Sequence, residues 1–359
     1  MIKSPWLAII DHSIDIGTKK VLVVLRVPVA VLANKGAAIQ LHDCECIGLK
    51  VCEQVNGDSI ALDLASIFTQ AGAPAAIIKD GDSTLGKGVR LWSGTQEAPV
   101  PVIDDIGHAM AIALKNQFEK APAYQRFIAL TTQGAARLRQ TDLAFLIPPK
   151  LRSKGRFQSI STLGKWADKM LDVFAVKGGA KKGSLLARLR IALPGFLLLK
   201  PFIKRFARTT QVVSEVLEVL KNQGLSQTTY ERCLRLSETL PKTSKVKHRL
   251  HQWLHRHIAI QQAITDLPLV VSSDIIESLF GNFKHSIARS PQADMNRTAL
   301  LIPALCGNLD RLTVTQALNQ TRHNDLAVWE QANIPYTVRK KRRAFFGKNS
   351  QISGIVKLE

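Results

Sequence analysis

Three acidic residues have the type and placement to act together on a phosphate ester. Asp11 and Asp80 each follow a short apolar run, and Glu277 lies in a later stretch with helical apolar periodicity. Carboxylate oxygens are the ligands that Mg²⁺ prefers, and two such ions about 3.5–4 Å apart can clamp both oxygens of an in-line phosphoryl displacement. The three acids therefore predict a two-metal site, provided that the fold brings them together.

Other acids compete for these roles. Asp82 lies two residues beyond the expected strand end, Asp15 lies in a turn, and Asp274 has no lysine seven positions later. Glu277 has such a lysine, Lys284, and seven residues are about two helical turns, so both side chains are expected on one face. An ordinary solvated Glu and Lys on a helix surface remains the alternative.

A second polar pair precedes a helical segment. Asp105 and His108 are three positions apart and are expected to face each other at the start of this helix. Asp104 competes with Asp105 but has no histidine at the same offset. We expect the pair to support the site, and a histidine that merely caps the helix start is the alternative.

The elements that must position these residues can be read from apolar runs and turn signals. Strands are expected at residues 6–10, 21–27, 46–55, 75–79 and 100–103, and helices at residues 58–71, 107–119 and 272–285. The first three strands are expected to be joined by hairpins, and the fourth follows a helix. This order predicts a mixed α/β sheet in which the first and fourth strands lie side by side, which would bring Asp11 and Asp80 together.

The positive charge of the chain is concentrated in its middle. The net charge of the 359-residue chain is +21, with 49 Lys and Arg against 28 Asp and Glu. Residues 1–110 contribute −3, whereas residues 150–260 contribute +17. Helical patterns without strands cover this region, and compensating acids are too few for a solvated helix surface. A polyanionic partner, most often nucleic acid, is expected here.

Several classes of protein are excluded or disfavoured. The greasiest stretch, residues 185–206, is interrupted by five cations, whereas a membrane span needs about 20 apolar residues. No secretory signal and no phosphate-binding G-x4-G-K-[ST] loop is present. The five cysteines lack zinc-type spacing, so reduced thiols in a cytoplasmic, nucleoid-associated protein are expected.

Four segments carry a resemblance to a known family. They are W-L-A-I-I-D-H-S at 6–13, A-I-I-K-D-G-D at 76–82, D-I-G-H at 105–108 and I-E-S-L-F-G-N-F-K-H at 276–285. The sequence resembles the DDE transposases of bacterial insertion sequences, which have an RNase H-like, retroviral-integrase-like core. The E-x6-K spacing is seen in these transposases. The string at 105–108 looks like the [C/D]-x2-H string of hobo/Activator-type and Mutator-type transposases.

The resemblance implies a fold and a domain plan. It implies an RNase H-like mixed sheet, with three antiparallel strands plus parallel strands, flanked by helices and carrying a large all-α insertion before the last catalytic helix. The expected domains are a first core part at 1–115, a basic helical insertion at 116–264, a last core part at 265–330 and a basic C-terminal tail at 331–359. The R-K-K-R-R run at 339–343 predicts a flexible tail that contacts phosphates, and an end that only adds solubility is the alternative.

The resemblance also implies an activity. Asp11, Asp80 and Glu277 would be the catalytic triad and would bind two Mg²⁺ ions, with Mn²⁺ as a substitute, for DNA strand cleavage and strand transfer. The partners would be the element ends, target DNA and further copies of the chain. Family members usually carry an N-terminal helix-turn-helix, for which the chain has no room before residue 6, so a separate end-recognition chain is expected. The alternatives are a DNA-binding remnant or a structure-selective nuclease.

A histidine-rich helix is expected at residues 245–264. Three histidines on one of its faces, His248, His251 and His255, could bind zinc, but the surrounding cations favour a DNA-facing helix. Trp253 is either a base-stacking or a core residue. The residues expected to contact DNA are Lys247, Arg249, Trp253, Arg256, Lys284 and His285.

Overall fold

The computed structural model describes residues 4–12, 19–52, 55–151, 155, 157–175, 180–287, 296–334 and 337–346. The chain divides into two compact units. Unit 1 consists of residues 1–104 and 272–359, and unit 2 consists of residues 105–271. The domain functions expected from the sequence stay predictions.

Unit 1 is built on a five-stranded mixed sheet. Its strands are β1 (Trp6–Asp11), β2 (Lys20–Pro28), β3 (Glu45–Cys52), β4 (Ala76–Lys79) and β5 (Val102–Asp104). The strand order is β3-β2-β1-β4-β5. The β3-β2 and β2-β1 pairs are antiparallel, and the β1-β4 and β4-β5 pairs are parallel. The expected RNase H-like fold class is therefore confirmed.

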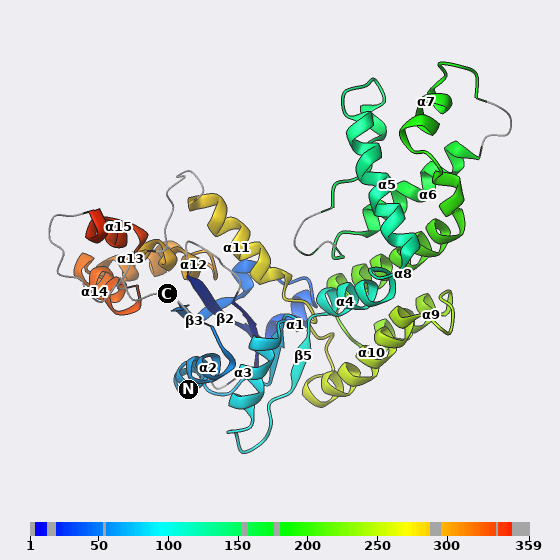
Figure 1. Ribbon diagram of the computed structural model, residues 1–359. Coiled ribbons are helices and arrows are strands. Elements are labelled where there is room, and N and C mark those ends of the chain that lie inside the picture. The colour runs from blue at the N-terminus through cyan, green and yellow to red at the C-terminus, as the bar shows by residue number, and fades with distance from the viewer. Residues whose placement is uncertain are drawn as a thin grey trace. The chain divides into compact units, whose positions relative to one another are not determined.

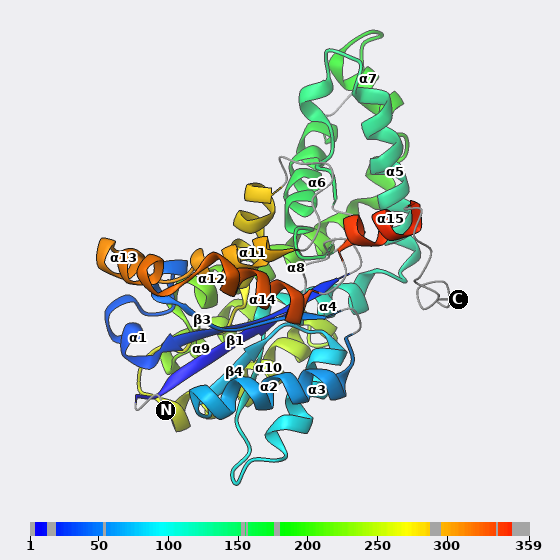
Figure 2. The ribbon, with the colours of Figure 1, turned by 90° about the vertical axis from the view of Figure 1, so that its left-hand side faces the viewer.

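One face of this sheet packs against two helices, α2 (Gly57–Ala71) and α3 (Ser83–Ser93). Trp6, Ala8 and Ile10 of β1 belong to the same buried cluster as residues of both helices. The strand alternates sides, so these three residues share one face of the sheet. Figure 2 shows α2 and α3 together on that side of β1 and β4.

The opposite face of the sheet is covered by the late segment of the chain. Helix α11 (Asp274–Ile287) contacts β1, and α12 (Leu301–Ala304) contacts β3. The apolar stripe expected on α11 is buried and consists of Ile276, Leu279, Phe280 and Phe283. Figures 1 and 2 both place α11 on the side of the sheet away from α2 and α3. About 260 residues of chain therefore separate β1 from its partner α11.

Three parts of unit 1 differ from the sequence-based expectation. Strands β2 and β3 are joined by α1 (Val29–Lys35) and the 3-10 turn η1 (Leu41–Asp43), so their connection is longer than a hairpin turn. Helix α3 was not expected, because its glycines lower helix propensity. The basic segment expected as a flexible tail lies in a helix, α15 (Val338–Phe346). A helix forms there because Lys and Arg are good helix formers despite their mutual repulsion.

Unit 2 is helical. Its helices are α4 (Ile106–Phe118), α5 (Pro122–Leu138), α6 (Ser161–Phe174), α7 (Leu185–Ala192), α8 (Lys200–Gln223), α9 (Gln227–Glu238) and α10 (Lys245–Ile264). Figure 1 shows α8 running beside α6. Aromatic rings of α4, α5 and α8 pack on one another, among them Phe118, Phe127 and Phe206. Breaks at Pro194 and Gly195 end α7 as expected, with Gly195 in the left-handed region at φ 72°.

Two further properties of the described residues concern the protein's helices and its cysteines. None of its described helices combines the length and the apolar character that crossing a bilayer requires. All five cysteines are free. Burial raises the pKa of the Cys44 thiol to about 12, and burial likewise raises that of Cys233 to about 12.

These shifts predict slow thiol chemistry in the native state. Iodoacetamide at pH 8 should label the folded protein slowly and label all five cysteines after denaturation, because the thiolate is the nucleophile. The folded state holds its thiol protons above the unfolded pKa, so stability should fall as the pH rises from about 9 towards 12. Rapid native labelling of Cys44 and Cys233 would contradict the burial.

The packing of α2 on α3 depends on a glycine. A Cβ added at Gly88 would lie 2.5 Å from Cγ2 and 2.6 Å from Cβ of Ile60. Gly88→Ala should therefore lower the free energy of unfolding by about 1–3 kcal/mol in urea titrations. Gly281→Ala is the matched control, because nothing lies within 4 Å of its added Cβ, and it should raise stability by up to about 1 kcal/mol. Equal effects of both variants would contradict this packing.

Candidate active site

The sheet brings two of the three predicted acids to neighbouring positions. Strands β1 and β4 are parallel, and Ile10 pairs with Lys79. Asp11 directly follows Ile10 and Asp80 directly follows Lys79, so the two aspartates are neighbours. Asp11 is 4% exposed, and its carboxylate accepts a hydrogen bond of 2.6 Å from the backbone N–H of His12. The Asp80 carboxylate accepts one of 2.8 Å from the backbone N–H of Asp82. Both acids thus lie at the carboxyl ends of adjacent parallel strands.

The third predicted acid lies on the helix that covers one face of this sheet. Side chains alternate between the two faces of a sheet, so Asp11 shares a face with Leu7 and Ile9. This face is opposite to the one that packs on α2 and α3. It therefore belongs to the face on which α11 contacts β1. Glu277 is an exposed residue in the first turn of α11. All three acids belong to unit 1, and two separate stretches of sequence supply them.

Two cationic or titratable residues accompany Glu277 on α11. Lys284 lies seven positions later and shares the same strip of the helix, as expected from the spacing. Lys284 and His285 are both exposed in the last part of the helix. Both side chains are therefore accessible to a ligand at that end of α11.

The rival acids have other structural roles. Asp82 caps the N-terminus of α3 and accepts hydrogen bonds from the backbone N–H groups of Thr84 and Leu85 at 2.8 and 2.9 Å. Asp104, at the end of β5, forms an ion pair of 2.8 Å with Lys79. Asp274 begins α11. The remaining rival, Asp15, lies outside the described residues.

One residue at the site was missed by sequence reasoning. His12 directly follows Asp11 and is 6% exposed. Its Nε2 lies 3.6 Å from the Asp82 carboxylate and its Nδ1 lies 3.9 Å from the Asp11 carboxylate. Nδ1 is a buried atom without a hydrogen-bond partner among the described residues. The only sequence signal was its position next to Asp11, where a ring nitrogen can reach the same ligand as the carboxylate.

The second predicted polar pair lies in unit 2. Asp105 is 2% exposed and caps α4 by accepting a hydrogen bond of 2.8 Å from the backbone N–H of His108. His108 Nδ1 lies 3.4 Å from the same carboxylate oxygen, and its Nε2 lies 3.2 Å from the side-chain amide nitrogen of Gln158. The two side chains therefore meet, in the arrangement in which a capping carboxylate also orients a histidine ring.

The histidines of α10 are engaged within unit 2. His251 Nε2 lies 2.7 Å from the Ser237 hydroxyl, and His255 Nδ1 lies 2.8 Å from the Tyr230 hydroxyl. Burial lowers the pKa of His251, and neighbouring Lys247 adds to this effect. Trp253 is 3% exposed and stacks on His257 at 4.2 Å between ring centroids. The indole is thus a core residue and no base can stack on it in this arrangement.

Other cationic residues of α10 lie on its exposed side. Arg249 and Arg256 are exposed and lie seven positions apart, so they share the helix face opposite the buried side. Lys247 is half-buried and lies on another side of the helix, because it is two positions before Arg249. The exposed strip of α10 is therefore cationic.

The donor set of unit 1 suits a hard divalent cation in type. Asp11, Asp80 and Glu277 supply carboxylate oxygens, and the buried orphan nitrogen of His12 faces Asp11. In the part of the chain that the structure describes, however, no three His, Cys, Asp or Glu side chains are gathered closely enough to hold a metal ion. The strand register places the two aspartates at neighbouring strand ends.

The chain was compared with family models, with curated proteins and with solved structures. No family model matches the chain. No curated protein matches its sequence. Among solved structures, the chain is similar to one described as the Drosophila P element transposase strand transfer complex, with 10% sequence identity and a TM-score of 0.42. This similarity covers 88% of the present chain and 77% of the other.

The capping role of Asp82 separates it from Asp80 experimentally. Asp82→Ala should lower the free energy of unfolding by about 0.5–2 kcal/mol, because two backbone N–H groups of α3 lose their acceptor. Asp80→Asn keeps an oxygen that can accept from the backbone of residue 82 and should change stability by less than about 0.5 kcal/mol. Urea titrations measure both, and a larger loss for Asp80→Asn would reverse the assignment.

Proposed function

We propose that the protein is a DNA transposase that catalyses metal-dependent strand cleavage and strand transfer with Asp11, Asp80 and Glu277. One observation carries the proposal. Two aspartates end adjacent parallel strands of an RNase H-like sheet, and the face to which Asp11 belongs is covered by the helix that bears Glu277. Strand ends of this kind are where open α/β sheets bind their ligands.

The residues would act mainly by positioning and by charge. Asp11, Asp80 and Glu277 would hold Mg²⁺, and the bound ions would supply electrostatic stabilisation of the attacking and leaving oxygens. Hydrogen bonds from the backbone orient both aspartates before any ligand arrives. Lys284, two turns after Glu277, would contact a DNA phosphate close to the scissile bond.

The charge distribution supports DNA as the partner. Residues 150–260 contribute most of the net charge of +21, and the exposed strip of α10 presents Arg249 and Arg256. Lys247, Arg249, Arg256, Lys284 and His285 remain in the proposed DNA-contacting set, and Trp253 is left out because it is buried. We further propose that copies of the chain assemble on DNA, with Asp105 and His108 supporting the catalytic unit.

Two other functions would use some of the same residues. A DNA-binding remnant would bind DNA with a steep salt dependence but would not nick it when a divalent cation is added. A structure-selective nuclease would cut DNA but would not join it to a target. A strand-transfer assay with a pre-cleaved 3′-OH end and a plasmid target distinguishes all three functions.

The triad predicts a sharp mutational result. Asp11→Asn, Asp80→Asn and Glu277→Gln should each reduce Mg²⁺- or Mn²⁺-dependent cleavage of DNA with element ends by about a thousandfold or more, because each removes a carboxylate charge from the proposed site. DNA binding measured in EDTA should remain within about twofold, since no phosphate contact is lost.

Matched controls come from the rival acids. Asp274→Asn removes a carboxylate from the same turn of α11 as Glu277, and Asp104→Asn removes one from the end of the neighbouring strand β5. Both variants should keep at least about a tenth of the wild-type cleavage rate, after correction for folded protein. Wild-type cleavage by all three triad variants would contradict the proposed site.

A further inference from the structure

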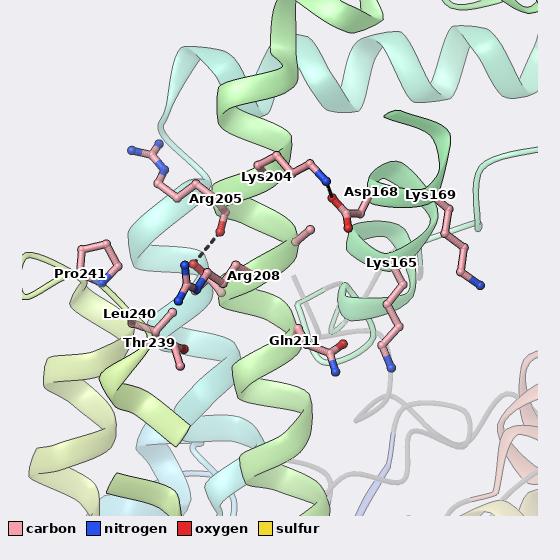
Figure 3. A pocket seen from close by; sticks show the side chains of 12 residues that line it. Lys165, Asp168, Lys169, Lys204, Arg205, Arg208, Gln211, Thr239, Leu240 and Pro241 are labelled. Atoms are coloured by element: carbon pink, nitrogen blue, oxygen red, sulfur yellow. Dashed lines mark hydrogen bonds and ion pairs between the residues drawn. The ribbon is translucent and has the colours of Figure 1, made fainter. Parts of the chain in front are cut away.

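Unit 2 contains a hollow whose lining is strongly cationic. It has a volume of about 670 Å³ and lies between α6, α8 and the segment Thr239–Pro241 that follows α9. Figure 3 shows its labelled charged side chains around α8, with α6 on one side and Thr239–Pro241 on the other. The volume falls within the range of about 300–1,000 Å³ found for ligand sites. The feature is thus a recess and not a flat basic surface.

The charges in this hollow do not balance. Five cations line it, together with one carboxylate. The cations are Lys165, Lys169, Lys204, Arg205 and Arg208, and the carboxylate is Asp168. Asp168 forms an ion pair of 2.9 Å with Lys204. For the side chains of the other four cations, the structure gives no ion pair with any residue that it describes.

An anion bound in the hollow would offset the repulsion between these cations. Like charges held close together repel, and a recess with low-dielectric walls strengthens their field and raises the local concentration of anions. Ala207, Leu240 and Pro241 supply apolar wall around the cations. Exposed lysines that only serve solubility would be spread over the surface and would not converge on one recess from two helices.

The residue types indicate which anion fits. Arg205 and Arg208 present planar forks of N–H donors that match phosphate or carboxylate oxygens in pairs, and the lysines add point charges. Cations spread along both α6 and α8 suit several linked phosphates better than a single small anion. The ligand class is therefore a chain of phosphate groups.

We propose that this hollow binds consecutive backbone phosphates of a DNA strand. The inference rests on the proposed function and locates one of its DNA contacts in unit 2. DNA is favoured over a free oligophosphate because the excess charge extends beyond the recess, through residues 150–260 as a whole. The hollow is separate from the exposed strip of α10, to which none of its lining residues belongs.

The test compares two variants that lose the same total charge. One loses three cations of the hollow, and the other loses three cations elsewhere in unit 2. The full chain carrying Lys165→Gln, Lys169→Gln and Arg208→Gln is compared with a control carrying Lys120→Gln, Arg126→Gln and Arg139→Gln. All six residues are exposed residues of unit 2, and the control residues lie outside the hollow. Anisotropy with labelled duplex and single-stranded DNA, in EDTA, gives affinity as a function of salt.

The hollow variant should reduce the slope of log K against log salt by about 3, since each lost phosphate contact lowers it by about 1. The control should reduce the slope by less than about 1. In the wild type, bound DNA should also protect Lys165 and Lys169 from acetylation. Equal slopes for both variants, or no protection of these lysines, would overturn the proposal.

Two further outcomes separate the alternatives. If inorganic tripolyphosphate protects Lys165 and Lys169 while the hollow variant binds DNA like the wild type, the site takes a free oligophosphate and the proposal is wrong. The protein could also fail to cleave DNA while the slope of log K against log salt falls only in the hollow variant and DNA protects the lysines. In that case the hollow binds DNA as proposed and the proposed catalysis is wrong.

Discussion

The parallel pairing of β1 with β4 is the constraint on which the candidate site depends. The register sets Ile10 opposite Lys79, and each chain continues into an aspartate. A shift of one residue would move one aspartate to the other face of the sheet, because side chains alternate along a strand. The fully buried, apolar residues of both strands hold this register. The core of unit 1 therefore positions the two carboxylates.

Burial of the Asp11 carboxylate is electrostatically unfavourable, and neighbouring groups compensate for it. A carboxylate that is 4% exposed, as in Asp11, is unfavourable unless donors or charges compensate it. The backbone N–H of His12 supplies one donor, and the imidazole of His12 lies between the carboxylates of Asp11 and Asp82. Placing polar groups at buried strand ends weakens a core, and natural proteins accept such costs mainly at functional sites.

The sequence predicted best those elements whose apolar runs are continuous. β1, β4 and α11 were recognised because their buried residues follow the expected periods, and the adjacency of Asp11 and Asp80 follows from them. Helix α3 was missed because Gly86 and Gly88 resemble a loop in sequence, although Gly88 is the glycine that allows the close approach of α3 to α2. The burial of Trp253 depends on how α10 packs in unit 2, which no local pattern encodes. The role of Asp82 as a cap depends on α3, so the sequence, which disfavoured Asp82 only by its distance from the strand end, could not predict that role.

Mapping the parts of the chain that surround a bound divalent cation shows whether Asp11, Asp80 and Glu277 form one site. Fe²⁺ substituted for Mg²⁺, with ascorbate and peroxide, generates hydroxyl radicals that cut the polypeptide close to the ion. In the presence of DNA, we expect cuts near Asp11, near Asp80 and near Glu277, all suppressed by excess Mg²⁺. Cuts confined to the first two positions, or none that Mg²⁺ suppresses, would contradict the claim that these three acids form one site.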